Sequence, residues 1–208
     1  MIITPYRIST MTATAYIGTN IELIQLYDNI NVTDVEKEGV IYAEFGNNKH
    51  SQVSKGTNLK KRFVRVNGKK QASTRRFDNS ITIKYNLMNS NEDGQKTPQM
   101  MTTLNIKVFK NGKIQMTGVK SEAIGRCAVD SIITLIKDCQ TSIDSKIVED
   151  IGALKSSDFC IHLINSDFKV NMEIRRDLLA NLLMEKYSCT CSYEPCIYPG
   201  VKIQYFMN

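Results

Sequence analysis

The chain has 208 residues, of which 42% are apolar and 23% are charged, and its formal net charge is +6. This composition is typical of a folded globular protein and excludes wholesale disorder. No apolar run approaches the roughly 20 residues that span a bilayer, and the first residues lack the pattern of a secretory signal. We therefore expect an intracellular protein with no membrane partner, whose six cysteines are thiols.

The positive charge is concentrated in one segment. Between Phe45 and Phe77 there is no acidic residue, whereas the rest of the chain carries 17 bases against 21 acids. Such a block is typical of a surface that binds a polyanion, above all nucleic acid, and a solvated basic loop is the alternative. The ten bases of this acid-free segment are Lys49, Lys55, Lys60, Lys61, Arg62, Arg65, Lys69, Lys70, Arg75 and Arg76.

The first predicted element is a half-buried strand over residues 7–18, where side chains alternate in character. Its two faces are Met11, Ala13, Ala15 and Ile17 on one side and Thr10, Thr12, Thr14 and Tyr16 on the other. Thr19 or Asn20 is expected to cap a helix over 21–30. Further along, we expect short strands and loops in the acid-free segment, a strand over 80–88 and a loop over 90–99.

The clearest local signal is a hairpin over 104–118 that turns at Asn111-Gly112. A two-residue loop would place Gln115 and Thr117 among the core residues. A three-residue loop, over 111–113, instead gathers the apolar residues on one face. Because register follows the buried face, we predict the three-residue loop. The core face is then Ile106, Val108, Ile114 and Met116, and the opposite face is Asn105, Lys107, Phe109, Gln115 and Thr117.

The second half repeats an earlier order of elements. Ser121 is expected to cap a helix over 122–138, and a polar connector follows. A strand over 159–168, a helix over 174–187 and a turn into a last strand then recur in the order seen at the start, which predicts two copies of one unit, the second incomplete. The helix carries an apolar stripe expected to be core, made of Ile174, Leu178, Leu182 and Leu183.

Three short runs resemble the TATA-binding protein family. Residues 111–122 (NGKIQMTGVKSE) resemble its SGK…TGAKSE segment, residues 192–200 (SYEPCIYPG) its SYEPELFPG, and residues 14–23 (TAYIGTNIEL) its first strand and helix, TVNLGCKLDL. The runs follow the family's order, and the chain is identified as a divergent member of the kind found in large DNA viruses or protists.

The resemblance implies an α+β saddle, in which a curved antiparallel sheet carries helices on its convex face. The chain then divides into a first repeat over 8–140 with an expanded basic insertion at about 45–77, a connector over 141–157, and the front part of a second repeat over 158–208.

The implied function is that of a general transcription initiation factor that binds and bends promoter DNA through the minor groove, where phenylalanine wedges pry open base steps. Phe109 and Tyr198 match wedge positions, and Phe77 is the expected partner of Phe109. Thr117 matches a base-contacting threonine. The DNA-binding residues so expected are Phe109, Phe77, Tyr198, Thr117, Gln115, Lys107, Asn105, Thr10, Thr12, Asn165, Arg75 and Arg76.

The resemblance also implies partners: A·T-rich double-stranded DNA, a transcription factor IIB-like protein for which Glu194 is a candidate contact, and RNA polymerase. It places the protein in the nucleus or in a cytoplasmic viral factory. We expect no cofactor and no enzyme activity, since no catalytic motif is present. Cys189, Cys191 and Cys196 lack the paired spacing of a zinc site, which leaves metal binding open.

Departures from the family favour an alternative function. Thr10 stands where the family has a central asparagine, and Leu163 stands at the corresponding place in the second half, with Asn165 on the same strand face. A second TG-K segment is absent. The alternative is a protein-interaction module of a transcription complex that has the same fold but no sequence-specific DNA binding.

Overall fold

The computed structural model describes residues 3–47, 50–57, 63–66, 69–72, 79–90, 96–187 and 189–205. It divides into two compact units. The main unit is Arg7–Asp167, and the small unit combines Met1–Tyr6 with Phe168–Asn208.

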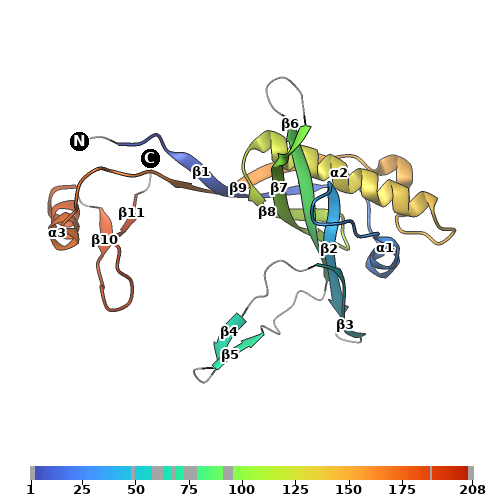
Figure 1. The fold of residues 1–208 in the computed structure, drawn as a ribbon, viewed down its shortest axis with the longest axis horizontal. Helices are drawn as coiled ribbons and strands as arrows, with labels where there is room; N and C mark the ends of the chain where they lie inside the picture. Colours follow the sequence, from blue (N-terminus) through green and yellow to red (C-terminus); the bar gives the residue numbers. More distant parts are fainter. Residues whose placement is uncertain are drawn as a thin grey trace. The chain divides into compact units, whose positions relative to one another are not determined.

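A seven-stranded antiparallel sheet forms the main unit, with its strands in the order β3-β2-β6-β7-β8-β1-β9 (Figure 1). A separate two-stranded sheet pairs β4 (Phe63–Val66) with β5 (Lys69–Ala72). The strands of the large sheet are β1 (Arg7–Tyr16), β2 (Gly39–Asn47), β3 (His50–Gly56), β6 (Ser80–Ser90), β7 (Lys96–Phe109), β8 (Lys113–Val119) and β9 (Ser157–Asp167).

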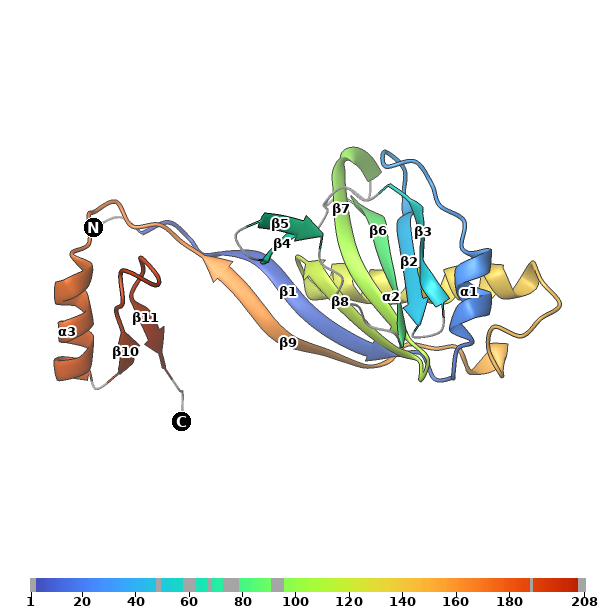
Figure 2. The ribbon, with the colours of Figure 1, turned by 90° about the horizontal axis from the view of Figure 1, so that it is seen from below.

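Two helices, α1 (Leu23–Asn29) and α2 (Glu122–Thr141), pack against one face of this curved sheet and against each other (Figure 2). A short 3-10 helix, Ile151–Ala153, follows α2. Small residues such as Ala13 and Ala128 are fully buried at the core and let the layers approach closely. The predicted α+β fold, a curved antiparallel sheet with helices on one face, is confirmed.

The β7–β8 hairpin has the predicted faces. Ile106 lies opposite Met116 and Val108 opposite Ile114, and all four side chains are fully buried. The loop runs over residues 110–112, one residue earlier than predicted. Its last residue, Gly112, has φ of +78°, and a Cβ there would lie 2.3 Å from the carbonyl oxygen of Thr19. Glycine is required by both the backbone conformation and the space.

The predicted cap of α1 is wrong. The helix begins at Leu23, and its N-cap, Glu22, makes no side-chain capping hydrogen bond. Tertiary hydrogen bonds explain the difference. The amide of Ile21 donates to the carbonyl of Lys110 at 2.8 Å, and the amide of Glu22 donates to the carbonyl of Ile147 at 2.8 Å. These bonds hold the backbone extended past Thr19 and Asn20. In contrast, the cap of α2 is confirmed, since Ser121 Oγ accepts from the amide of Ile124 at 3.3 Å.

Part of the loop predicted over 90–99 is strand. Residues 96–99 begin β7, and Lys96 lies opposite Ser90 on β6. β8 pairs with β7 only from Asn105 onward, so the first part of β7 has a neighbour on one side in the described sheet. A proline is tolerated on such an edge because its missing N–H need not face a neighbour, which explains how Pro98 fits in the strand.

The small unit contains α3 (Arg176–Tyr187) and a hairpin of β10 (Thr190–Ser192) and β11 (Lys202–Gln204). The apolar stripe predicted to be core on α3 is largely exposed, with Leu178 at 54% and Leu182 at 48%. Among the described residues of this unit only Ala180 is buried. The prediction is wrong because these residues offer α3 only a short two-stranded sheet to pack against.

We expect Gly112→Ala to lower the free energy of unfolding by about 2–4 kcal/mol, because alanine meets both left-handed strain and the Thr19 carbonyl. Urea unfolding followed by circular dichroism measures this. The control is Gly152→Ala, where the added Cβ would lie 3.2 Å from the side chain of Asp150 and no positive φ is present. Equal losses in the two variants would contradict the strain argument.

Candidate nucleic-acid interface

The sheet face opposite α1 and α2, here called the open face, carries aligned rows of mostly polar side chains. Residues directly opposite in an antiparallel sheet share a face, so the register identifies each row. The first row is Glu44, Thr82, Lys107, Gln115, Thr14 and Cys160. The second is Tyr42, Lys84, Asn105, Thr117, Thr12 and Leu163.

Six of the predicted site residues therefore come together on one surface: Asn105, Lys107, Gln115, Thr117, Thr10 and Thr12. Thr10 lies opposite Asn165 on β9, which adds a seventh. Hydroxyl and amide groups dominate this patch. Such groups hydrogen-bond without carrying a net charge, so the patch suits recognition of polar edges rather than ion pairing.

Several of these groups are already held in place. Lys107 Nζ donates to Thr82 Oγ1 at 2.9 Å, which fixes the ammonium over the face. Thr10 Oγ1 accepts from the amide of Gly118 at 3.1 Å, beside the irregularity between β1 and β8. The Thr10 hydroxyl therefore keeps its own proton to donate outward. Side chains fixed in this way lose less conformational entropy when a ligand binds.

The open face includes residues that the sequence did not single out. His162 Nε2, on the outermost strand β9, lies 2.7 Å from Thr14 Oγ1 on β1. Towards the β2 edge, the hydroxyl of Tyr42 donates to Glu44 Oε2 at 2.6 Å, and Lys84 Nζ lies 5.5 Å from the centre of the Tyr42 ring. Strict alternation from Leu163 and Asn165 would have placed His162 on the other face, and it is the irregularity of the β1–β9 register between Thr12 and Ala13 that brings His162 beside Thr14. Nothing local shows that β2 lies next to β6, so Glu44 was not predictable.

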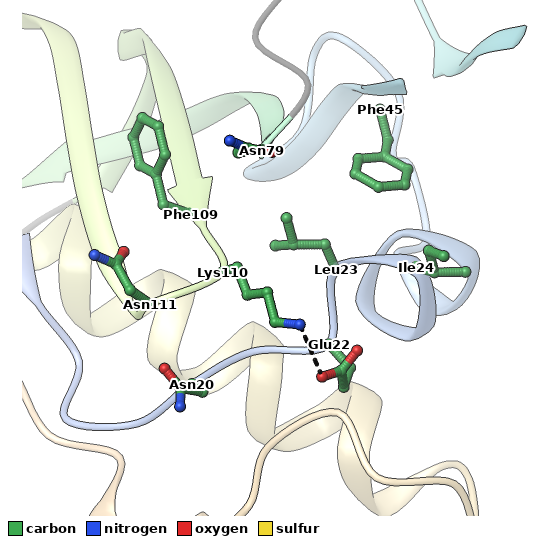
Figure 3. Close-up of a pocket in the computed structure, with 9 residues that line it drawn as sticks. All are labelled: Asn20, Glu22, Leu23, Ile24, Phe45, Asn79, Phe109, Lys110 and Asn111. Carbon is green, nitrogen blue, oxygen red and sulfur yellow. Dashed lines mark ion pairs between the residues drawn. The ribbon is translucent and has the colours of Figure 1, made fainter. Parts of the chain in front are cut away.

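Phe109 ends β7 opposite Ser80 and is half-buried. Its ring forms one wall of a pocket of about 770 Å³ that Phe45, Leu23 and Ile24 also line. Figure 3 shows Phe109 and Phe45 on opposite sides of the pocket, and the ion pair between Lys110 Nζ and Glu22 Oε1, 3.7 Å apart, at its rim. Phe109 thus stands at the border between the open face and an apolar pocket at the end of the sheet.

Tyr198 and Glu194 lie together on the β10–β11 turn of the small unit. The amides of Ile197 and Tyr198 both donate to the carbonyl of Glu194 at 2.9 Å. Tyr198 is 61% exposed, and its ring lies over Gly200, where a Cβ would come within 2.6 Å of it. Tyr198 and Glu194 also line a common open pocket of about 660 Å³. The turn therefore presents an aromatic ring beside a carboxylate.

Phe77, Arg75 and Arg76 lie outside the described residues. The acid-free segment is nevertheless represented by Lys55, whose Nζ donates to the carbonyls of Tyr27 and Asp28 at 2.8 Å and of Ile30 at 3.4 Å. It also lies 4.9 Å from the centre of the Tyr27 ring. Burial raises the pKa of Tyr27, and the charges of Asp28 and Glu44 add to that rise. Lys55 therefore stabilises the C-terminal end of α1, and binding of a polyanion by the acid-free segment stays a prediction.

The sequence left metal binding by Cys189, Cys191 and Cys196 open. Within the described residues, no three histidine, cysteine, aspartate or glutamate side chains are placed to hold a metal ion. All six cysteines are free thiols. In that same part of the chain, no helix has both the length and the apolar character needed to cross a bilayer.

Comparison with known proteins supports the resemblance seen in the sequence. No family model matches the chain. A curated protein of Acanthamoeba polyphaga mimivirus, described as TATA-box-binding protein-like, is 28% identical over an alignment of 203 residues, and the match covers 91% of this chain and 51% of that protein. The chain therefore spans about half the length of this relative. The predicted similarity to a divergent, viral protein of the TATA-binding protein type is confirmed.

We expect Lys55→Met to lower the free energy of unfolding by about 1–2 kcal/mol, because three carbonyls at the end of α1 lose their charged donor. Urea unfolding followed by circular dichroism measures this loss. Lys37→Met is the control, since its side chain is 69% exposed and pairs only with exposed Asp34 among its described ion pairs. No loss of stability in Lys55→Met, or an equal loss in Lys37→Met, would contradict the capping role.

Proposed function

We propose that this protein is a transcription factor that holds duplex DNA by its minor groove against the open face and bends it at Phe109. The observation that carries the proposal is the register, which aligns Asn105, Thr117 and Thr12 in one row, beside Lys107 and Gln115 in the next. The similarity to a protein described as TATA-box-binding protein-like supports the same function.

The chemistry of the open face suits the minor groove. A·T pairs present only acceptors there, adenine N3 and thymine O2, whereas G·C pairs add a donor. Threonine hydroxyls and the amides of Asn105, Gln115 and Asn165 supply donors to such acceptors. Their small size and lack of charge let a sheet approach the floor of the groove. We infer a preference for A·T-rich promoter DNA.

Phe109 suits a wedge because it is an apolar ring at the end of an otherwise polar row. The sheet holds its backbone through pairing with Ser80. Inserting such a ring between base pairs costs a few kcal/mol of unstacking, which extra contacts along the bent duplex offset. Glu44, beyond Phe109 on β2, disfavours phosphates at that edge. The duplex then lies over β7, β8, β1 and β9 and leaves the sheet at Phe109.

The remaining assignments follow from the resemblance and belong to the same proposal. Phe77 acts with Phe109, Tyr198 is the wedge of the second half, and Arg75 and Arg76 contact phosphates. Glu194 contacts a transcription factor IIB-like protein, with RNA polymerase as a further partner. The exposure of Tyr198 and Glu194 on one turn is compatible with both roles. The site of action is the nucleus or a cytoplasmic viral factory.

A second candidate function is a protein-interaction module of a transcription complex. Two observations favour it: the apolar pocket that Phe109 shares with Phe45, and the exposed stripe on α3 that includes Leu178 and Leu182. Exposed apolar surface of this kind marks protein contacts more often than DNA contacts. The two candidates differ in what Phe109 does, since only the first requires its ring between bases.

We expect Phe109→Ala to abolish DNA bending and to weaken binding at least about tenfold, or ~1.4 kcal/mol, because the wedge is lost. Energy transfer between dyes at the two ends of an A·T-rich duplex measures the bend. Ile24→Ala is the control, since it alters the same pocket from α1 without touching the open face. Persistent bending by Phe109→Ala, or no bending by the unaltered chain, would favour the interaction module.

Thr117→Val should reduce the preference for A·T-rich over G·C-rich duplexes by about 2- to 10-fold, because it removes one donor while keeping the side-chain shape. Competition binding with the two duplexes at one salt concentration measures the ratio. Thr134→Val, on the exposed side of α2, should leave the ratio unchanged. An unaltered ratio in Thr117→Val would remove this residue from the reading surface.

A further inference from the structure

The β4–β5 ribbon lies within the acid-free segment, between β3 and β6 in the chain, and pairs in a sheet of its own. Its register places Arg65 directly opposite Lys70 and Val66 opposite Lys69. Three cationic positions therefore occupy two adjacent rungs of a ribbon whose strands have only four residues each. The sequence alone did not show that Arg65 and Lys70 lie opposite each other.

Such a ribbon is unfavourable by itself. Like charges directly opposite each other destabilise a strand pair, and an isolated two-stranded hairpin is marginally stable in water. No acid within residues 46–77 offsets the charge. A bound polyanion neutralises Arg65 and Lys70 together. Their pairing then stabilises the ribbon instead of destabilising it.

We propose that the β4–β5 ribbon is a second DNA contact, which grips the phosphate backbone of the duplex separately from the open face. This inference rests on the proposed function. The ribbon concentrates cations and the segment around it has no acid. Charge complementarity therefore favours phosphates as its ligand. A two-stranded ribbon also has the width that a major groove accepts. The open face reads the minor groove, while the ribbon adds salt-dependent affinity and no sequence preference.

The test compares the double variant Arg65→Ala/Lys70→Ala with the unaltered chain in binding to an A·T-rich duplex over a range of salt concentrations. Each lost phosphate contact reduces the slope of log K against log salt by about 0.9, so the expected reduction is about 1.8. DNA bending by the bound complex should remain. Arg65→Lys, which keeps the charge, should keep the slope.

The matched control is Lys146→Ala/Lys155→Ala, which removes the same charge from exposed positions in the connector. An equal change of slope in the control would show a general effect of net charge and overturn the proposal, as would an unchanged slope in the ribbon variant. If the ribbon variant loses binding to polyglutamate but keeps its binding to DNA, the ligand of the ribbon is an acidic protein instead. Failure of the unaltered chain to bind DNA would refute the proposed function itself.

Discussion

The parity of one turn determines the surface on which the proposed function depends. Three residues, 110–112, connect β7 to β8, and this odd number puts Ile106 and Ile114 in the core and Lys107 and Gln115 on the open face. A turn shorter by one residue would leave the faces of β7 unchanged and exchange those of β8, which would move Gln115 into the core and Ile114 onto the open face. Gly112 keeps that length possible, because the turn closes against the backbone of Thr19 with no space for a side chain.

The sequence predicted elements whose two faces differ in chemistry. The alternation in β1, the hairpin of β7 and β8, and the cap of α2 each depend on residues close together in the chain, and the structure has all three. Predictions failed where distant segments decide the outcome. The cap of α1 was wrong because Lys110 and Ile147 hold its preceding residues extended. The contacts of Lys55 with carbonyls of α1 were likewise not predictable from neighbouring residues.

The same distinction applies to the candidate site. Most of its residues on β1, β7 and β8 could be placed on one face from the sequence, since strand parity needs no tertiary information. Glu44 could not, because its presence on that face follows from the pairing of β2 with β6. The acid matters for the proposed function, in which it disfavours phosphates on the β2 side of the open face. The sequence thus predicted the polar groups of β1, β7 and β8 that share the open face and missed Glu44 on β2.

In the proposed function, the charge that attracts DNA and the groups that recognise it lie on different parts of the chain. The open face is rich in hydroxyl and amide groups, with Lys107 held by Thr82, so it offers geometry and hydrogen bonds but little long-range attraction. The positive excess lies in the acid-free segment, from which Lys55 is withdrawn to stabilise α1. Phosphate contacts supply most of the affinity for DNA, and groove contacts supply the specificity. A weakly charged reading surface therefore needs a separate source of affinity, and the paired cations of the β4–β5 ribbon have the charge for that task.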